Sequence, residues 1–185
     1  MPRPKTVSDE GVLEAAVAVL AREGMGFTLT DVARSVGLSR ATLIQRFGDR
    51  DSLLRRMALH EVEATRAWLD SLPFETGPDA LDRFLSTIVL GMGSGGGFSA
   101  RVAIAALEAR DPALRRHAAQ RYALVIDAIA ARLPPGEDRE AMACHLHAVI
   151  AGATMQWVAS PQTEDLGAFV LARVRQATRW LGIGS

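Results

Sequence analysis

The chain has 185 residues, of which 49% are hydrophobic and 23% are charged. This balance excludes a disordered chain and leaves room for one domain or two small ones. The N-terminus lacks the apolar core of a secretion signal, and the longest stretch with few charges, residues 84–100, is interrupted by glycines and serines. We therefore expect a cytoplasmic protein with no membrane contact and, because Cys144 is its one cysteine, no internal disulfide.

The net charge is zero, but the charges are unevenly distributed. Residues 1–60 hold nine Lys and Arg against seven Asp and Glu, whereas the remaining residues hold twelve against fourteen. A basic start before a more acidic remainder is typical of a nucleic-acid-binding head on a second part with another role. Arg3 and Lys5 fit either a disordered tail or a basic arm near a DNA minor groove.

Helical periodicity runs through almost the whole chain, and no segment alternates with a period of two residues for long enough to predict a strand. A first helix is expected from Asp9 to Glu23. Residues 28–52 then contain the pattern of a helix-turn-helix. Thr28 is placed to cap a short helix, Gly37 supplies the positive φ that a sharp helix end needs, and Ser39 caps the next helix.

This next helix has two different faces. Leu43 and Phe47 lie four residues apart and are expected to face inward. The outward residues are rich in hydrogen-bond donors: Arg40, Ala41, Thr42, Gln45 and Arg46. Such a face suits the major groove of DNA, where Arg can bond guanine and Gln can bond adenine.

Six further helices are expected, with these bounds: Asp49 to just before Pro73, Ala80–Gly91, Ala100–Arg110, Asp111–Leu133, Glu140–Ala159 and Leu166–Leu181. The sequence therefore predicts an all-α fold of about nine helices. We expect a three-helix helix-turn-helix head, residues 1–50, and a larger helical body, residues 51–185.

The run FTLTDVARSVGLSRATLIQRFGDRDSLL, residues 27–54, resembles the DNA-binding head of the tetracycline-repressor (TetR) family of bacterial regulators. The body is similar to that family in its helix pattern, its length and the GATMQWVASP segment at residues 152–161. The resemblance implies a homodimer whose heads bind a palindromic double-stranded operator. It also implies that the body binds a small-molecule effector, and that the protein is nucleoid-associated when bound.

The resemblance also implies roles for single residues. Thr28 matches a capping threonine that touches a phosphate, residues 39–42 match the start of the recognition helix, and Arg50 matches a basic residue that contacts the DNA backbone. Two positions depart from the family pattern, where tyrosine is common in place of Ile44 and an aromatic residue or histidine in place of Arg46. Isoleucine cannot donate a hydrogen bond, so we expect Arg46 to replace the missing phosphate contact with a charged one.

A ligand cavity is expected in the body, because its helices carry more apolar surface than a DNA-binding head requires. Methionines suit a pocket that adapts its shape, and Tyr122 or His145 is expected to meet one polar group of a mostly apolar ligand. The expected lining residues are Met92, Phe98, Ile104, Tyr122, Ile126, Met142, His145 and Met155.

The last two long helices are expected to form a two-fold dimer interface. Small residues there allow close approach of backbones, and aromatic residues supply buried area. The expected interface residues are Val149, Gly152, Ala153, Gln156, Trp157, Phe169, Val170, Val174, Ala177 and Trp180.

Two other patterns resemble a phosphate-binding loop and a metal site, but each is better explained by a structural role. The glycine-rich residues 91–97 follow no strand and precede no Lys-Ser/Thr pair, so an interhelical loop near the cavity is favoured over a phosphate-binding loop. Cys144, His145 and His147 do not converge on a helix, so packing is favoured over a metal site. We expect no metal and no cofactor.

The sequence thus predicts a DNA-binding transcriptional regulator, a repressor released from its operator by a small molecule. The alternative is a DNA-binding regulator whose body recruits a protein partner and binds no small molecule. An enclosed cavity in the body would favour the first, and a filled body with an exposed apolar groove the second. No Ser, His and Asp are arranged as in a hydrolase, so an enzyme is not expected.

Overall fold

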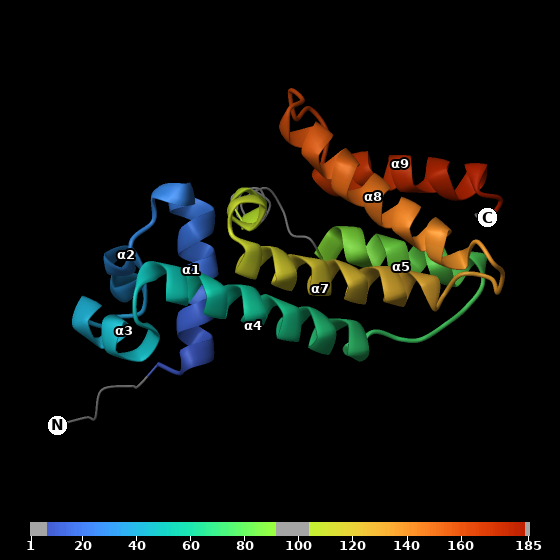
Figure 1. The fold of residues 1–185 in the computed structure, drawn as a ribbon. Coiled ribbons are helices and arrows are strands. Elements are labelled where there is room, and N and C mark those ends of the chain that lie inside the picture. The colour runs from blue at the N-terminus through green and yellow to red at the C-terminus, as the bar shows by residue number, and fades with distance from the viewer. Residues whose placement is uncertain (1–6, 92–103, 184–185) are drawn as a thin grey trace. The chain divides into compact units, whose positions relative to one another are not determined.

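The structure is a computed structural model that describes residues 7–91 and 104–183. Within these ranges every regular element is a helix, which confirms the all-α prediction (Figure 1). The described residues form two compact units, the first made of residues 7–64 and 104–120 and the second of residues 65–91 and 121–183. The expected residues Arg3, Lys5, Met92 and Phe98 lie outside the described residues.

Helices α4 and α7 contribute to both units. The elements of the first unit are α1 (Asp9–Glu23), the short 3-10 helix η1 (Gly24–Gly26), α2 (Leu29–Ser35), α3 (Arg40–Phe47), the helical residues 104–110 and the first parts of α4 (Arg50–Ser71) and α7 (Pro112–Ala130). The second unit contains the rest of α4 and α7 together with α5 (Pro78–Gly91), α8 (Arg139–Val158) and α9 (Leu166–Trp180).

Local hydrogen bonds set the start and the end of α2. The Thr28 Oγ1 accepts from the backbone N–H of Asp31 at 3.3 Å, and the Asp31 carboxylate accepts from the backbone N–H of Thr28 at 2.9 Å. This reciprocal capping box satisfies donors that the first helical turn leaves unpaired. At the other end Gly37 has φ +68°, and the backbone N–H of Leu38 donates to the carbonyl of Ala33 at 2.9 Å. The turn before α3 is thus built as the sequence predicted.

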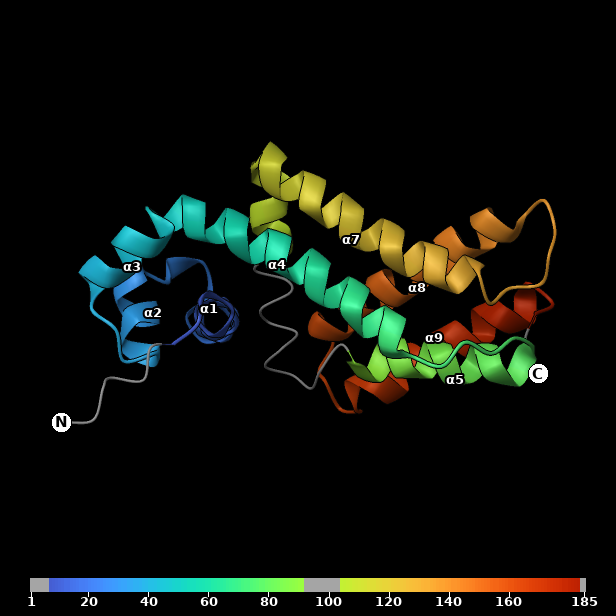
Figure 2. The same cartoon turned by 90° about the horizontal axis from the view of Figure 1, so that it is seen from below.

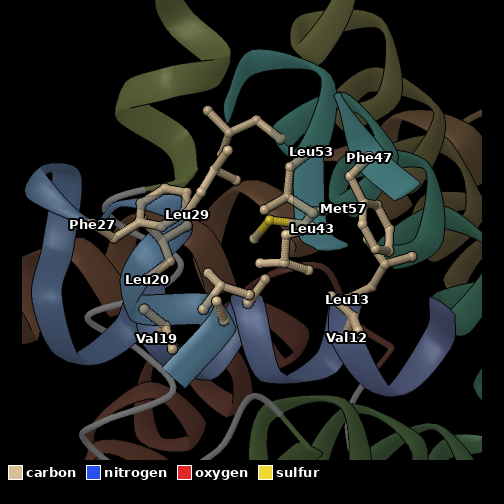
Figure 3. Packing of buried hydrophobic residues seen from close by; sticks show 14 of the residues in the cluster. Val12, Leu13, Val19, Leu20, Phe27, Leu29, Leu43, Phe47, Leu53 and Met57 are labelled. Carbon is tan, nitrogen blue, oxygen red and sulfur yellow. The ribbon is translucent and has the colours of Figure 1, made fainter. Parts of the chain in front are cut away.

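The core of the first unit lies between α1, α2, α3 and the start of α4 (Figure 3). The side chains labelled there are buried and point toward one another: Val12, Leu13, Val19, Leu20, Phe27, Leu29, Leu43, Phe47, Leu53 and Met57. Burial of one such side chain stabilises the fold by about 1.5–3 kcal/mol. Because Leu53 and Met57 complete this core, the first unit extends past the predicted boundary at residue 50.

In the second unit α9 packs against both α8 and α5, as Figures 1 and 2 show. Val170 and Val174 of α9 are no more than 1% exposed, and Leu146 of α8 and Leu85 of α5 are equally buried. Helix α9 therefore supplies a central apolar surface of this unit.

Helix α7 ends at Ala130, three residues before the expected end at Leu133. Pro134 and Pro135 come directly after Leu133, and the residue before a proline disfavours the helical conformation. In the resulting turn Arg132 is 6% exposed, and its guanidinium donates to the carbonyl of Pro73 at 2.9 Å. Burial lowers the pKa of Arg132 from its ordinary value. The side chain links the end of α7 to the segment that precedes α5.

A single carboxylate links α1 to α3 and α4. The Asp9 Oδ1 accepts from the Arg46 Nε at 2.9 Å and also from its Nη2, and the Asp9 Oδ2 accepts from the Arg56 Nη2 at 2.8 Å. Arg56 also donates to the backbone carbonyl of Arg46 at 3.1 Å. We call these three residues the Asp9 anchor. The hydrogen bonds from Arg46 and then from Arg56 hold the pKa of Asp9 below its ordinary value of 3.8.

We expect Asp9→Asn to lower the free energy of unfolding at pH 7, and the deficit relative to wild type to shrink in acid. A carboxyl group whose pKa is lowered by folding stabilises the native state above its unfolded pKa, here near 3.8. That contribution is lost as the pH falls through the folded-state pKa, which lies lower still. Because the Asp9 side chain is 46% exposed, solvent screening limits the effect to about 1 kcal/mol or less.

Urea unfolding of the full chain between pH 7 and about pH 2, which spans the unfolded-state pKa and extends below it, measures this difference. Glu14→Gln, an exposed substitution on the same helix, is the matched control and should leave the midpoint nearly unchanged. A deficit for Asp9→Asn that stays constant down to the lowest pH would contradict the assignment.

Candidate nucleic-acid interface

The starts of α2 and α3 are two exposed helix N-termini. Thr28 and Ser39 are both exposed, and the Ser39 Oγ accepts from the backbone N–H of Thr42 at 3.0 Å. The cap oxygens satisfy the third N–H of each helix, while the first N–H groups have no intrahelical partner. Such groups, together with the helix dipole, favour an anion such as a phosphate.

The exposed face of α3 is the face that the sequence predicted to be outward. Leu43 and Phe47 are 0% and 4% exposed, which confirms that they face inward. The half-buried residues of α3 are Thr42 and Arg46, and its exposed residues are Arg40, Ala41, Ile44 and Gln45. The guanidinium of Arg40 has no acidic partner within the described residues, so the helix presents an unneutralised cation at its first turn.

Arg46 differs from Arg40 because its guanidinium is held by Asp9. The Arg46 side chain is 21% exposed, and it lies 5.5 Å from the centre of the Phe47 ring. The carboxylate offsets the positive charge of Arg46, so this residue adds less to the local potential than Arg40 does.

Arg50 is fixed beside the start of α2. The Arg50 Nε donates to the backbone carbonyl of Phe27 at 3.0 Å, and the guanidinium lies 4.5 Å from the centre of the Phe27 ring. Since Phe27 directly precedes Thr28, the structure brings the Arg50 side chain close to the α2 cap. A cation in this position adds to the attraction that the helix N-terminus exerts on anions.

Three residues that shape this surface were not among the predicted site residues: Asp9, Phe27 and Arg56. Asp9 is 37 residues from Arg46 along the chain, and no local spacing connects them. The sequence did contain one signal for Phe27, because an aromatic residue just before a helix cap often packs under the first turn.

The predicted ligand residues are distributed over both units. Ile104 is half-buried in the first unit and packs against its core, whereas the others that the structure describes lie in the second. Of these, Ile126 and Met142 are half-buried, and Tyr122, His145 and Met155 are exposed. One pocket of the second unit, of about 240 Å³, is lined by none of them; its residues are Pro78, Leu81, Asp82, Arg175, Thr178, Arg179 and Ile183.

The Tyr122 ring contacts a histidine other than the predicted one. Its centroid lies 5.1 Å from that of His147, with the two planes inclined at 54°. Burial, and to a smaller extent the positive charge of Arg121, lowers the pKa of His147 below its ordinary value of 6.5. His147 is therefore neutral at pH 7 and has one ring nitrogen that accepts and one that donates a hydrogen bond.

Half of the predicted interface residues are buried inside the second unit of the single chain. Side chains already covered by their own chain offer no surface to a second copy. The buried residues are Ala153, Phe169, Val170, Val174 and Ala177, each 9% exposed or less. Val149 and Trp157 are half-buried, and Gly152, Gln156 and Trp180 are exposed.

Among the described residues no group of His, Cys, Asp and Glu is arranged to hold a metal ion. None of the helices described is both long enough and apolar enough to cross a membrane.

The first part of the chain matches a known protein family. Residues 12–57 match the family described as bacterial regulatory proteins, tetR family. No curated protein matches the chain.

Similar folds occur in many solved structures. A transcriptional regulator from Rhodococcus sp. Rha1 is 18% identical, with a TM-score of 0.75 over 94% of this chain and 97% of its own. The TetR family transcriptional regulator PfmR from Thermus thermophilus is also 18% identical, with a TM-score of 0.64 over 94% and 97%. A regulator from Saccharomonospora viridis in complex with choline is 18% identical, with a TM-score of 0.68 over 91% and 93%.

At these identities the solved structures establish the fold, and the family match over residues 12–57 spans most of α1 together with α2 and α3. Residues 12–57 of this chain are therefore similar to the bacterial regulatory proteins of the tetR family, and the described residues share the fold of the solved regulators.

Proposed function

We propose that this chain is a repressor that binds a palindromic operator as a homodimer and leaves it when a small, mostly apolar molecule binds the body. The observation that supports DNA recognition is the exposed face of α3, where Arg40, Ala41 and Gln45 stand beside two capped helix starts. We place the protein in the bacterial cytoplasm, on the nucleoid when bound.

In this proposal the exposed residues divide into two roles. Arg40 and Gln45 reach base edges in the major groove, because Arg can bond guanine O6 and N7 and Gln can bond adenine N6 and N7. Ala41 and Thr42 lie in the first turn of α3, next to Arg40. Phosphates are held at the helix starts by Thr28 and Ser39. The nearby cations Arg46 and Arg50 hold further phosphates.

We expect Arg40→Ala and Gln45→Ala each to weaken specific binding about 10- to 100-fold, since one good side-chain–base pair contributes roughly 1–3 kcal/mol of discrimination. Arg40→Ala should also reduce the salt dependence, whereas Gln45→Ala should not. The measurement starts by selecting bound sequences from a random DNA pool. Affinities for a selected sequence and for random DNA are then measured at several salt concentrations.

The control is Arg116→Ala, which removes an exposed arginine of α7 in the same unit. It should leave the ratio of specific to random binding unchanged. If wild type enriches no sequence from the pool, the proposed function is refuted.

The dimer is supported by the surface of α8 that α9 does not cover. Among the exposed residues of α8 are the small or apolar Ala148, Ala151, Gly152 and Met155. A Cβ added at Gly152 would meet no atom within 4 Å, so this surface is open in the single chain. Trp180, at the end of α9, is 80% exposed. Exposed apolar area of this kind is typical of a protein–protein interface.

We expect Gly152→Arg to convert a dimer into a monomer, because the larger charged side chain fits the single chain but not a closely packed interface. Sedimentation velocity at micromolar concentration measures this. Ala123→Arg, at an exposed position of α7, is the control and should stay dimeric. A wild-type chain that sediments as a monomer would contradict the proposal, because two heads must reach successive major grooves about 34–36 Å apart.

The effector is proposed to bind in the second unit near Tyr122. Its ring lies against the ring of the partly buried and neutral His147, and the half-buried Ile126 follows Tyr122 by about one helical turn on α7. A small number of polar groups among apolar side chains is typical of small-molecule sites. A regulator of the same fold has been solved with choline, a small quaternary ammonium alcohol.

We expect at least one compound in a panel of small, mostly apolar molecules, to which choline is added, to release the selected DNA. Tyr122→Phe should then raise the concentration needed for release about 2- to 10-fold, because one hydrogen bond contributes about 0.5–1.5 kcal/mol. The affinity for DNA without the compound should not change. A panel without any releasing compound would favour the alternative in which the body recruits a protein partner.

A further inference from the structure

Ile44 is a large aliphatic side chain on the exposed face of α3. It is 41% exposed, although Leu43 beside it in sequence is fully buried. On a helix, residues three and four apart are neighbours, so Ile44 lies next to Ala41 and Arg40 on the surface. These three residues and Gln45 are the exposed residues of α3.

The position of Ile44 is well defined by the backbone. Its carbonyl accepts from the N–H of Gly48 at 2.8 Å, so the helical hydrogen bonding of α3 includes Ile44. Isoleucine is branched at Cβ and adopts one strongly preferred χ1 rotamer in a helix. A ligand that contacts Ile44 therefore loses little free energy by ordering this side chain.

The chemistry of Ile44 restricts what it can recognise on DNA. It has no donor or acceptor in its side chain, so it cannot bond a phosphate or the polar edge of a base. In the major groove the apolar group offered by a standard base is the 5-methyl of thymine. Ala41 adds a second methyl group next to Ile44 on the same surface.

We propose that Ile44, with Ala41 beside it, contacts the 5-methyl group of a thymine in each operator half-site and so determines specificity at that base pair. This inference rests on the proposed operator binding. It assigns Ile44 a role in reading the sequence, whereas the family resemblance implied only that a phosphate contact is missing at this position.

Leu59, an exposed aliphatic side chain elsewhere in the first unit, provides a comparison for Ile44. Leu59 on α4 is 44% exposed, which is close to the value for Ile44. Single aliphatic side chains at a surface are common and need no partner. Ile44 differs because its exposed neighbours are Arg40 and Gln45, which we propose to read bases. Leu59→Ala is therefore a matched control for the loss of an exposed aliphatic side chain.

The test uses the full chain and a sequence that wild type selects from a random pool. Each thymine of that sequence is replaced in turn by deoxyuridine, which lacks only the 5-methyl group. We expect one thymine in each half-site at which this replacement weakens wild-type binding about fourfold per half-site, the effect of losing one buried carbon. For Ile44→Ala the same replacement should have no effect. Ile44→Val should keep most of the sensitivity, and Leu59→Ala all of it.

The possible results are distinct. Deoxyuridine sensitivity that disappears only in Ile44→Ala supports the inference. If wild type selects a sequence but no thymine replacement matters, or if Ile44→Ala is as sensitive as wild type, the inference is overturned and operator binding stands. If no sequence is selected, the proposed function fails and the inference falls with it.

Discussion

The burial of Leu43 and Phe47 is the interaction on which the candidate interface depends. Helix α3 has eight residues, and a helix of this length is unstable in water without tertiary contacts. Its exposed face can be rigid only because its other face is packed into the core that α1 and α4 share. The Ser39 cap and the Asp9 anchor then fix its start and its last turn.

The Asp9 anchor also affects the charge of this surface. It joins two arginines to one carboxylate, so part of the positive charge near α3 is offset within the protein. Non-specific attraction to DNA depends on such charge, whereas discrimination between sequences depends on contacts with bases. In the proposed complex with DNA, a head built in this way would gain less from phosphates and depend more on the side chains of α3 that lack acidic partners among the described residues.

Local rules were sufficient to predict much of this region from the sequence. The capping box at Thr28, the positive φ of Gly37 and the inward direction of Leu43 each depend on residues within one or two helical turns. The pairing of Asp9 with Arg46 could not be predicted in this way, because it depends on how α1 crosses α3. The extension of the first core to Leu53 and Met57 depends on tertiary packing in the same way.

The second unit shows a different limit of sequence reasoning. Periodicity identified Val170 and Val174 as an apolar stripe, but it could not tell whether a helix of the same chain or a second copy covers that stripe. The structure assigns it to the protomer, since both are buried where α9 packs against α8 and α5. The surface left for the proposed dimer is therefore the opposite side of α8, around Gly152, together with the exposed Trp180. A two-fold dimer would present every base contact of α3 twice, so the discrimination of each half-site would multiply. That multiplication would let a head with a partly offset charge bind one sequence selectively.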